Sequence, residues 1–334
     1  MKKFARFLAL CGVLIAAPAT AQTSYSSLYV FGDSLVDSGN AFIQTGGIEA
    51  PSDDGFFLGR FSNGPNFADY LSFSLDGTLA TPALAGGDNY AVGGATAAYT
   101  GSLSPSFVEQ IVYFDVLGGG APIPSDALVL VAFGGNDVRE TISIGGAIDF
   151  TSSVGAFGAG LDMLYARGAR NFLVAGPPDI GLLPRSLEDA GDVPGRLAEL
   201  TSRSLQISTL FQGTSAAFAD VSGAQVNYFD LFSFDHAVRA DPAAFGLPAT
   251  LDTADPCQII GGGLFQFSNC ANSLFFDEIH PTTIAHLAIA SAMSAQLDQA
   301  SAVPEPATWL MLLLGFGLLG TKVRTTRRRA LLAA

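Results

Sequence analysis

The sequence predicts an α/β fold in which a parallel sheet is covered by helices on both faces. Short apolar runs rich in β-branched residues recur along the 334-residue chain, and they have the length and composition of strands buried on both faces. Longer segments with helical periodicity lie between these runs. Strands that alternate with helices in this way form parallel sheets with helical covers.

The expected elements follow one another in this alternating order. Strands are predicted at residues 28–31, 127–133, 171–175 and 225–229. Helices are predicted at residues 107–117, 154–167, 194–218 and 282–297. Gly168 follows the second helix and Pro281 precedes the last one, positions at which these residue types end and begin helices. In such sheets, sites form at the carboxyl ends of strands, where Ser34 and residues 134–137 are expected.

Residues 1–21 are typical of a secretory signal peptide. A basic start is followed by an apolar stretch over residues 7–17 and by a small-x-small triplet at 19–21, which is the pattern that signal peptidases cleave. We expect the mature chain to begin at Gln22. An uncleaved anchor helix is the alternative, although the apolar stretch is short for a membrane span.

Residues 303–334 form a second distinct segment. A Pro-Glu-Pro motif at 304–306 precedes an uncharged, Leu-rich run to Thr321 and a basic tail. The run is near the lower length limit of a transmembrane helix, with the tail arginines on the cytoplasmic side; an amphipathic helix of the fold is the alternative, but the run has no polar face. The arrangement resembles the PEP-CTERM sorting signal of Gram-negative bacteria. This resemblance implies export, a transient inner-membrane tether, and cleavage near the motif by an exosortase-type peptidase.

Residues 22–302 are expected to form one domain, because no charge run, low-complexity linker or internal repeat divides them. They hold eight arginines, no lysine and 29 acidic residues, which gives a net charge of −21. Such a surface repels nucleic acid and anionic lipid headgroups. Nucleic-acid binding is therefore not expected.

The exported part contains two cysteines, Cys257 and Cys270, which is an even number. In an exported chain such a pair predicts a disulfide, with two free thiols as the alternative. The sequence contains no Cys-x-x-Cys and no His-x-x-x-His, which are common spacings of metal ligands. Neither a metal nor a cofactor is expected.

Two motifs together suggest nucleophilic catalysis. Gly32-Asp33-Ser34-Leu35 follows the first expected strand, and Asp277 and His280 lie three residues apart on one later turn. A serine hydroxyl becomes a nucleophile when a histidine takes its proton and a carboxylate orients that histidine. Taken singly, Gly-Asp-Ser is also an ordinary turn sequence, and a lone histidine is more often structural. His236 and His286 are interpreted as structural or surface residues.

Two further motifs can stabilise an oxyanion. Gly93 and Gly94 allow the backbone to approach a substrate closely, and the Asn136 amide is a recognised donor to a developing oxyanion. The alternatives are a tight turn at the glycines and a helix N-cap at Asn136.

The four motifs resemble the blocks of the GDSL, or SGNH, hydrolase family. Residues 31–40 are similar to its nucleophile block, Gly93-Gly94 to its glycine block, residues 135–137 to its asparagine block, and residues 277–281 to its acid-base block. The blocks occur in the family's order and span most of the mature chain.

Two more segments, 59–65 and 241–246, resemble the branch that contains plant GDSL esterases, bacterial autotransporter esterases and phospholipase-like haemolysins. The Gly-x-Ser-x-Gly elbow of α/β-hydrolases is absent around Ser34, which argues against that fold.

The resemblance implies a three-layer α/β/α, flavodoxin-like fold and hydrolysis of acyl esters. It assigns Ser34 as the nucleophile, His280 as general base and then acid, and Asp277 as the residue that orients His280. The oxyanion hole is assigned to the backbone N–H groups of Ser34 and Gly94 and the side chain of Asn136.

Other functions stay open at this point. A protein of the same family can act as a phospholipase or transfer the acyl group to another alcohol. A non-catalytic extracellular matrix or cell-surface protein, associated with exopolysaccharide, is the alternative of a different class. Five phenylalanines between positions 56 and 73 either line an acyl pocket or belong to ordinary core packing.

Overall fold

The computed structural model describes residues 25–191, 193–261 and 264–301, together with 314–317, 319 and 324. The signal peptide expected at 1–21 lies outside the described residues, as does almost all of the sorting segment expected at 303–334 and its transmembrane run. None of the helices in the described part is long and apolar enough to cross a membrane. Ser24–Gln296 form one compact unit, which contains the sheet and the candidate site.

Four parallel strands form the central sheet. Their order is β1 (Leu28–Gly32), β2 (Leu128–Ala132), β3 (Asn171–Ala175) and β4 (Gln225–Phe229). The pairing runs without a register shift, from Leu28 opposite Leu128 to Ala175 opposite Phe229. The four strands predicted from the sequence are therefore confirmed.

An extended segment continues the sheet beyond β1. The N–H of Val30 donates to Asp88 O at 3.0 Å, and the N–H of Tyr90 donates to Val30 O at 2.7 Å. This segment lies between β1 and β2 in sequence but on the outer side of β1 in space. The order is that of the flavodoxin-like sheet, in which successive strands are added first on one side of β1 and then on the other. Where the strand order reverses in this way, a crevice forms at the carboxyl ends of the strands.

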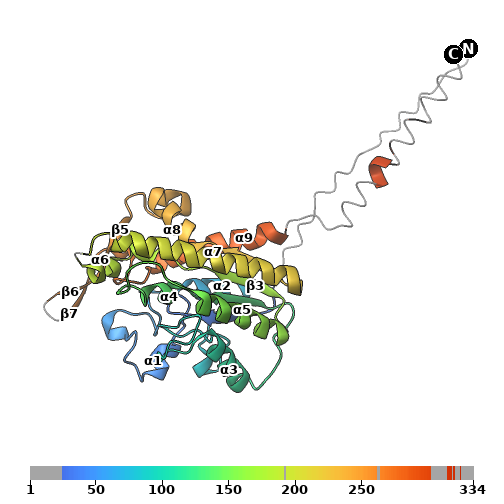
Figure 1. Cartoon of the computed structure of the whole chain (residues 1–334), viewed down its shortest axis with the longest axis horizontal. Helices are drawn as coiled ribbons and strands as arrows, with labels where there is room; N and C mark the ends of the chain where they lie inside the picture. The colour runs from blue at the N-terminus through green and yellow to red at the C-terminus, as the bar shows by residue number, and fades with distance from the viewer. Residues whose placement is uncertain are drawn as a thin grey trace, which may run out of the picture. The chain divides into compact units, whose positions relative to one another are not determined.

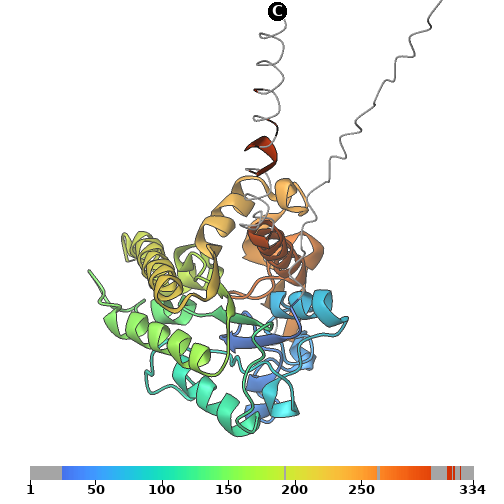
Figure 2. The ribbon, with the colours of Figure 1, turned by 90° about the vertical axis from the view of Figure 1, so that its right-hand side faces the viewer.

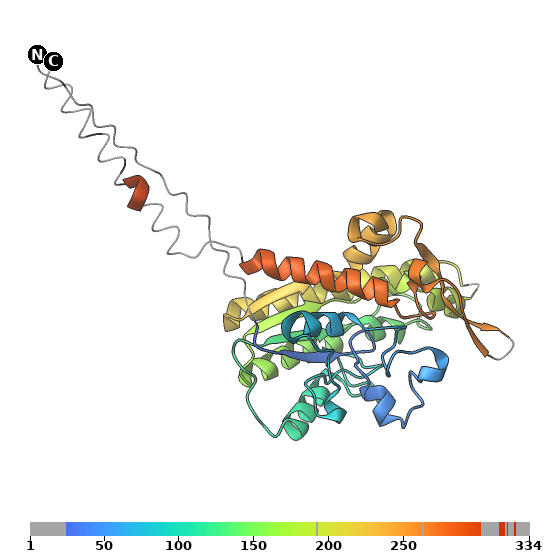
Figure 3. The same cartoon turned by 180° about the vertical axis from the view of Figure 1, so that it is seen from behind.

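Helices cover both faces of the sheet and complete three layers (Figures 1 and 2). One face carries α3 (Phe107–Leu117), α5 (Thr151–Ala166) and α7 (Arg196–Ser222), and the other carries α2 (Phe67–Asp76) and α9 (Thr283–Ser301). The second face is the side seen in Figure 3. The four predicted helices are confirmed, with ends that differ by a few residues.

Aromatic rings fill the space between the sheet and the first helical layer. Phe31 of β1 lies 6.1 Å, centroid to centroid, from Phe107 of α3. Phe157 of α5 stacks on Phe211 of α7 at 4.2 Å, and all four side chains are buried. Such burial stabilises the fold by roughly 1.5–3 kcal/mol for each large apolar side chain.

Local sequence signals explain where several helices begin and end. Asn66 and Asp69 form a capping box at the start of α2, and Ser106 and Glu109 form one at the start of α3, which satisfies backbone N–H groups that have no partner inside the helix. Gly223, with a φ of 73°, ends α7 in the left-handed conformation that glycine adopts without strain.

The prediction that strand 225–229 is buried on both faces is wrong. Gln225 is exposed, the next three residues are half-buried, and only Phe229 is buried. β4 is an edge strand with a neighbour on one side only, so its residues are less covered than those of the central strands.

Several short elements were not predicted. The helices are α1 (Asn40–Gln44), α4 (Gly135–Arg139), α6 (Pro184–Ala190) and α8 (Leu231–Ala240). The strands are β5 (Asp252–Pro256), β6 (Gln258–Gly261), β7 (Leu264–Phe267) and β8 (Ser273–Phe275). β5 pairs with β8, and β6 with β7, outside the central sheet.

Candidate active site

Ser34 lies in the turn that directly follows β1, at the carboxyl edge of the sheet. Asp33 holds this turn: its Oδ1 accepts from the N–H of Leu35 at 3.0 Å, and its carbonyl accepts from the N–H of Asp37 at 3.0 Å. Ser34 is half-buried, whereas Asp33 is buried. Burial raises the pKa of Asp33 to about 7, because the charged form loses its solvation.

Asp37 links the serine turn to the glycine motif. Its carboxylate accepts four backbone N–H groups, from Gly39 at 2.7 Å, Asn40 at 2.6 Å, Ala41 at 3.1 Å and Gly93 at 2.9 Å. Burial raises its pKa to about 6, although the four donors lower it. Asp37 is fully buried and bonded to the backbone of both segments, so it braces the site.

His280 joins the serine to a carboxylate. Its Nε2 lies 2.9 Å from Ser34 Oγ, and its Nδ1 lies 2.7 Å from Asp277 Oδ2. Asp277 Oδ1 also accepts the N–H groups of Ile279 at 2.8 Å and His280 at 2.7 Å. Burial alone would raise the pKa of Asp277, but the charge and hydrogen bonds of His280 outweigh it and lower that pKa.

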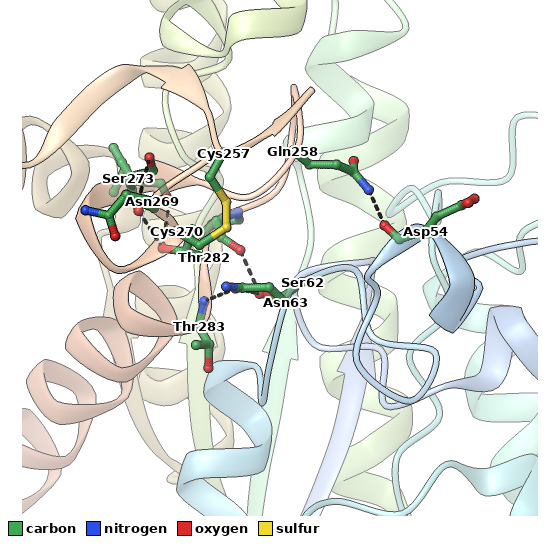
Figure 4. The surroundings of a disulfide bond; sticks show 12 residues. Asp54, Ser62, Asn63, Cys257, Gln258, Asn269, Cys270, Ser273, Thr282 and Thr283 are labelled. Carbon is green, nitrogen blue, oxygen red and sulfur yellow. Dashed lines mark hydrogen bonds between the residues drawn. A yellow bond between two sulfur atoms is a disulfide. The ribbon is translucent and has the colours of Figure 1, made fainter. Parts of the chain in front are cut away.

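A disulfide anchors the chain that leads into Asp277 (Figure 4). Cys257 and Cys270 are bonded, as the sequence predicted. Beside the bond, the N–H of Cys257 donates to Phe275 O at 3.0 Å, and the N–H of Gln258 donates to Phe276 O at 2.7 Å. These hydrogen bonds hold the two residues directly before Asp277 beside the cross-linked segment.

The segment around residues 59–65 supports the other end of this loop (Figure 4). Ser62 Oγ donates to Pro281 O at 2.8 Å, and Asn63 Oδ1 accepts the N–H of Thr283 at 2.9 Å. A Cβ on Gly64 would lie 2.6 Å from Thr283 Oγ1, so only glycine permits this approach. This segment positions the loop of residues 277–281, which contains His280, a role that its sequence alone did not reveal.

Three N–H donors can converge on an oxyanion. Within the described residues, the backbone N–H groups of Ser34 and Gly94 donate to no other residue. Asn136 is 9% exposed, and its Nδ2 donates one hydrogen bond, to Ala95 O at 2.9 Å, which leaves its second amide proton. Gly94 has a φ of 80°, which glycine tolerates. Asn136 does not take the alternative N-cap role, because the N-cap of α4 is Gly134.

These groups line one cleft of about 330 Å³. Its lining includes Ser34, Gly94, Asn136, His280, Phe61 and Arg139. The ring of Phe61 lies 5.0 Å from that of His280. Of the phenylalanines considered for an acyl pocket, Phe61 lines this cleft, Phe67 is buried and Phe73 is 58% exposed.

An apolar pocket of about 50 Å³ adjoins the cleft. Leu35, next to Ser34, and Ile279, next to His280, both line it, and Ile279 also lines the cleft. Nothing in the sequence marks Leu35, Ile279 and Arg139 as lining residues, although the first two are immediate neighbours of the proposed catalytic residues.

The other two histidines do not contact Ser34. His236 Nε2 lies 3.0 Å from Asp179 Oδ2. His286 is buried in α9 with its ring against Phe67, and burial lowers its pKa to about 3. In the part of the chain that is described, no group of three or more potential ligands could hold a metal ion.

A cleft at the carboxyl edge of a parallel α/β sheet is the usual place of a ligand-binding or catalytic site in such folds, and comparisons with known families identify the class of protein. A model of GDSL-like Lipase/Acylhydrolase matches residues 28–293. The chain therefore belongs to this family of esterases and lipases. A second model, the PEP-CTERM protein-sorting motif, matches residues 302–329.

Curated relatives extend over most of the chain. A GDSL esterase/lipase of Arabidopsis thaliana is 27% identical over 340 residues, covering 86% of this chain and 95% of its own. The phosphatidylcholine-sterol acyltransferase of Aeromonas hydrophila is 24% identical over 355 residues, covering 89% of this chain and 98% of its own. The relatives thus include proteins named for hydrolysis and one named for acyl transfer.

Solved structures of esterases and lipases also align. An acetylxylan esterase from Geobacillus stearothermophilus has a TM-score of 0.41 at 14% identity, covering 81% of this chain and 94% of its own. The extracellular lipase from Streptomyces rimosus has a TM-score of 0.35 at 17% identity, covering 83% and 100%.

Proposed function

We propose that the protein is an exported serine esterase that hydrolyses acyl esters through an acyl-Ser34 intermediate. The observation that carries the proposal is the contact series from Ser34 Oγ to His280 Nε2 at 2.9 Å and from His280 Nδ1 to Asp277 at 2.7 Å. This is the geometry that general-base activation of a serine requires.

Acylation begins when Ser34 Oγ attacks the ester carbonyl. His280 Nε2 takes the hydroxyl proton as the new C–O bond forms, and the carbonyl electron pair moves to its oxygen. The N–H groups of Ser34 and Gly94 and the amide of Asn136 stabilise this oxyanion. When the tetrahedral intermediate collapses, the bond to the alcohol breaks and His280 returns the proton to the leaving oxygen.

Deacylation repeats these steps with water. His280 removes a proton from water, the water oxygen attacks the acyl carbon, and the bond to Ser34 Oγ breaks as Ser34 regains a proton. Asp277 remains ionised throughout, since its lowered pKa keeps it charged at neutral pH. Its charge holds the His280 proton on Nδ1 and stabilises the imidazolium.

Acyl transfer is the second candidate function, favoured by the relative named as an acyltransferase. It uses the same intermediate, with an alcohol in place of water. A non-catalytic surface or matrix protein is a third reading, in which a serine-directed fluorophosphonate would fail to label Ser34.

The chain organisation that we propose places this domain at residues 22–302, after a signal peptide at 1–21. Residues 303–334 form the sorting segment, with a transmembrane helix and a basic tail that an exosortase-type peptidase removes. The match to the sorting motif over residues 302–329 supports export and surface sorting. The disulfide is of a kind that persists in oxidising compartments.

The test is hydrolysis of p-nitrophenyl esters, from acetate to palmitate, by the purified protein and its Ser34→Ala variant. The proposal expects turnover by the wild type and its loss in the variant, and the chain-length profile separates acetylesterase from lipase-like activity. Full activity in Ser34→Ala would refute the assignment of the nucleophile.

A further inference from the structure

Arg139, at the end of α4, is a cation in the active-site cleft that has no acidic partner among the described residues. It is half-buried and lines the cleft. Its Nη1 donates one long hydrogen bond, to Asn136 Oδ1 at 3.4 Å. Among the described residues, no carboxylate lies within 4.0 Å of its guanidinium.

The other seven arginines of the domain are bonded within the fold. Six form ion pairs with carboxylates: Arg60, Arg167, Arg185, Arg196, Arg203 and Arg239. Arg170 donates to two backbone carbonyls at 2.9 and 2.7 Å and lies over the ring of Tyr165. With 29 acidic residues for eight arginines, a shortage of carboxylates does not explain why Arg139 lacks one.

The carboxylates whose charges act on Arg139 are bonded elsewhere. Asp189, Asp277 and Asp33 are close enough to raise its pKa, although burial lowers that pKa more. Asp189 binds Arg185 at 3.2 Å, Asp277 binds His280, and Asp33 accepts the N–H of Leu35. None of these three carboxylates forms an ion pair with Arg139 in the described part of the chain.

Glu49 also lines the cleft. It is exposed to solvent, and it is not among the carboxylates that form ion pairs with arginines in the described residues. At an exposed position its charge is screened by water and salt, so Glu49 does not neutralise the cation.

We propose that Arg139 binds an anionic group of the substrate, so that the enzyme prefers esters that carry a carboxylate or a phosphate close to the scissile bond. A guanidinium offers planar, paired donors that match the oxygens of either group. Because Arg139 contacts Asn136, a residue of the proposed oxyanion hole, the anion must lie only a few bonds from the reacting carbonyl. This inference rests on the proposed esterase function and specifies its substrate class.

Two matched substrate pairs test the proposal and distinguish the two anions. Mono-p-nitrophenyl glutarate is compared with p-nitrophenyl pentanoate, which places a carboxylate on the acyl side. 1-Butyrylglycerol 3-phosphate is compared with 1-butyrylglycerol, which places a phosphate on the alcohol side. The readout is the ratio of kcat/KM, anionic to neutral, for the wild type, Arg139→Gln and Arg139→Lys.

The wild type is expected to prefer the anionic ester in one of the pairs. Arg139→Gln should lower that ratio by about 10-fold or more, mainly through KM, because a hydrogen-bonded charge is lost. Arg139→Lys should keep part of it, since lysine retains the charge but not the paired donors. Arg170→Gln, which removes one positive charge outside the cleft, is the control and should leave the ratio unchanged.

The outcomes separate this inference from the function on which it rests. If the neutral esters are hydrolysed through Ser34 while Arg139→Gln leaves both ratios within twofold of wild type, the anion site is refuted and the esterase stands. If no ester is hydrolysed and Ser34 is not labelled by a fluorophosphonate, both fail. Thermal unfolding checks that Arg139→Gln is folded; if it is not, the ratio for Arg139→Lys decides.

Discussion

Replacing Asp277 with asparagine should abolish general-base catalysis without disturbing the loop. Asp277 Oδ1 accepts two backbone N–H groups, at 2.8 and 2.7 Å, and an asparagine keeps these contacts only if its oxygen occupies the same place. Its NH₂ group then faces His280 Nδ1, where the carboxylate oxygen lay at 2.7 Å. Two donors cannot share this contact, so the ring moves its proton to Nε2.

The wrong tautomer removes the base. With its proton on Nε2, His280 donates toward Ser34 Oγ at 2.9 Å and cannot accept the hydroxyl proton. The wrong histidine tautomer in a serine-histidine-aspartate triad lowers kcat by about 10⁴-fold. This loss corresponds to an increase of about 5.4 kcal/mol in the activation free energy, at about 1.36 kcal/mol for each factor of ten.

Steady-state hydrolysis of p-nitrophenyl butyrate measures this loss, and the sequence offers a matched control. Asp252 Oδ1 also accepts two backbone N–H groups, from Ala254 and Asp255 at 3.0 Å each, with no histidine beside it. Asp252→Asn should therefore retain wild-type activity. If Asp277→Asn keeps more than a tenth of the wild-type kcat, the orienting role of Asp277 is refuted.

Three further predictions concern the oxyanion hole, the disulfide and pH. Asn136→Ala should lower kcat by about 10²–10³-fold in steady-state assays; a loss below threefold contradicts its role as a donor. Replacing Cys257 and Cys270 by serine opens a cross-link between residues 13 apart and should lower the free energy of unfolding in urea by about 3 kcal/mol; an unchanged midpoint contradicts this. Burial raises the pKa of Asp33 to about 7, so stability due to this carboxyl is complete below its unfolded pKa of about 4 and is lost as pH rises through 7. Asp33→Asn should therefore gain stability relative to wild type between pH 4 and pH 8, and an equal difference at both pH values rules this out.

The sequence was most informative where strong local patterns coincide with the fold. Apolar runs predict β1, β2 and β3, and helical periodicity predicts α3 and α7. These signals succeed because the residues that are buried in the fold are the same apolar residues that form the pattern. The even cysteine pair predicted the disulfide for a chemical reason, the oxidising compartment. The motif blocks marked residues that the fold brings together from positions 34, 94, 136 and 277–280.

What the sequence could not show depends on neighbours in space. Composition gave β4 the signature of a central strand, but it cannot reveal that the strand has one neighbour only. The segment 88–92 extends the sheet through a few hydrogen bonds, and its sequence has no alternating apolar pattern that would predict a strand.

The same limit applies to the cleft. Arg139 looks like any helical arginine in the sequence, and its significance comes from the absence of a carboxylate partner among the described residues. Ile279 stands beside His280 in the chain, yet its place between the cleft and the apolar pocket appears only in three dimensions.

Trapping the covalent intermediate would identify the nucleophile of the reaction. The protein is quenched with acid during turnover of p-nitrophenyl butyrate, digested, and analysed by peptide mass spectrometry, with the Ser34→Ala variant treated in parallel. We expect a butyryl group on the peptide that contains Ser34 and none in the variant. Turnover with the butyryl group on another residue, or with Ser34 never acylated, would contradict this expectation.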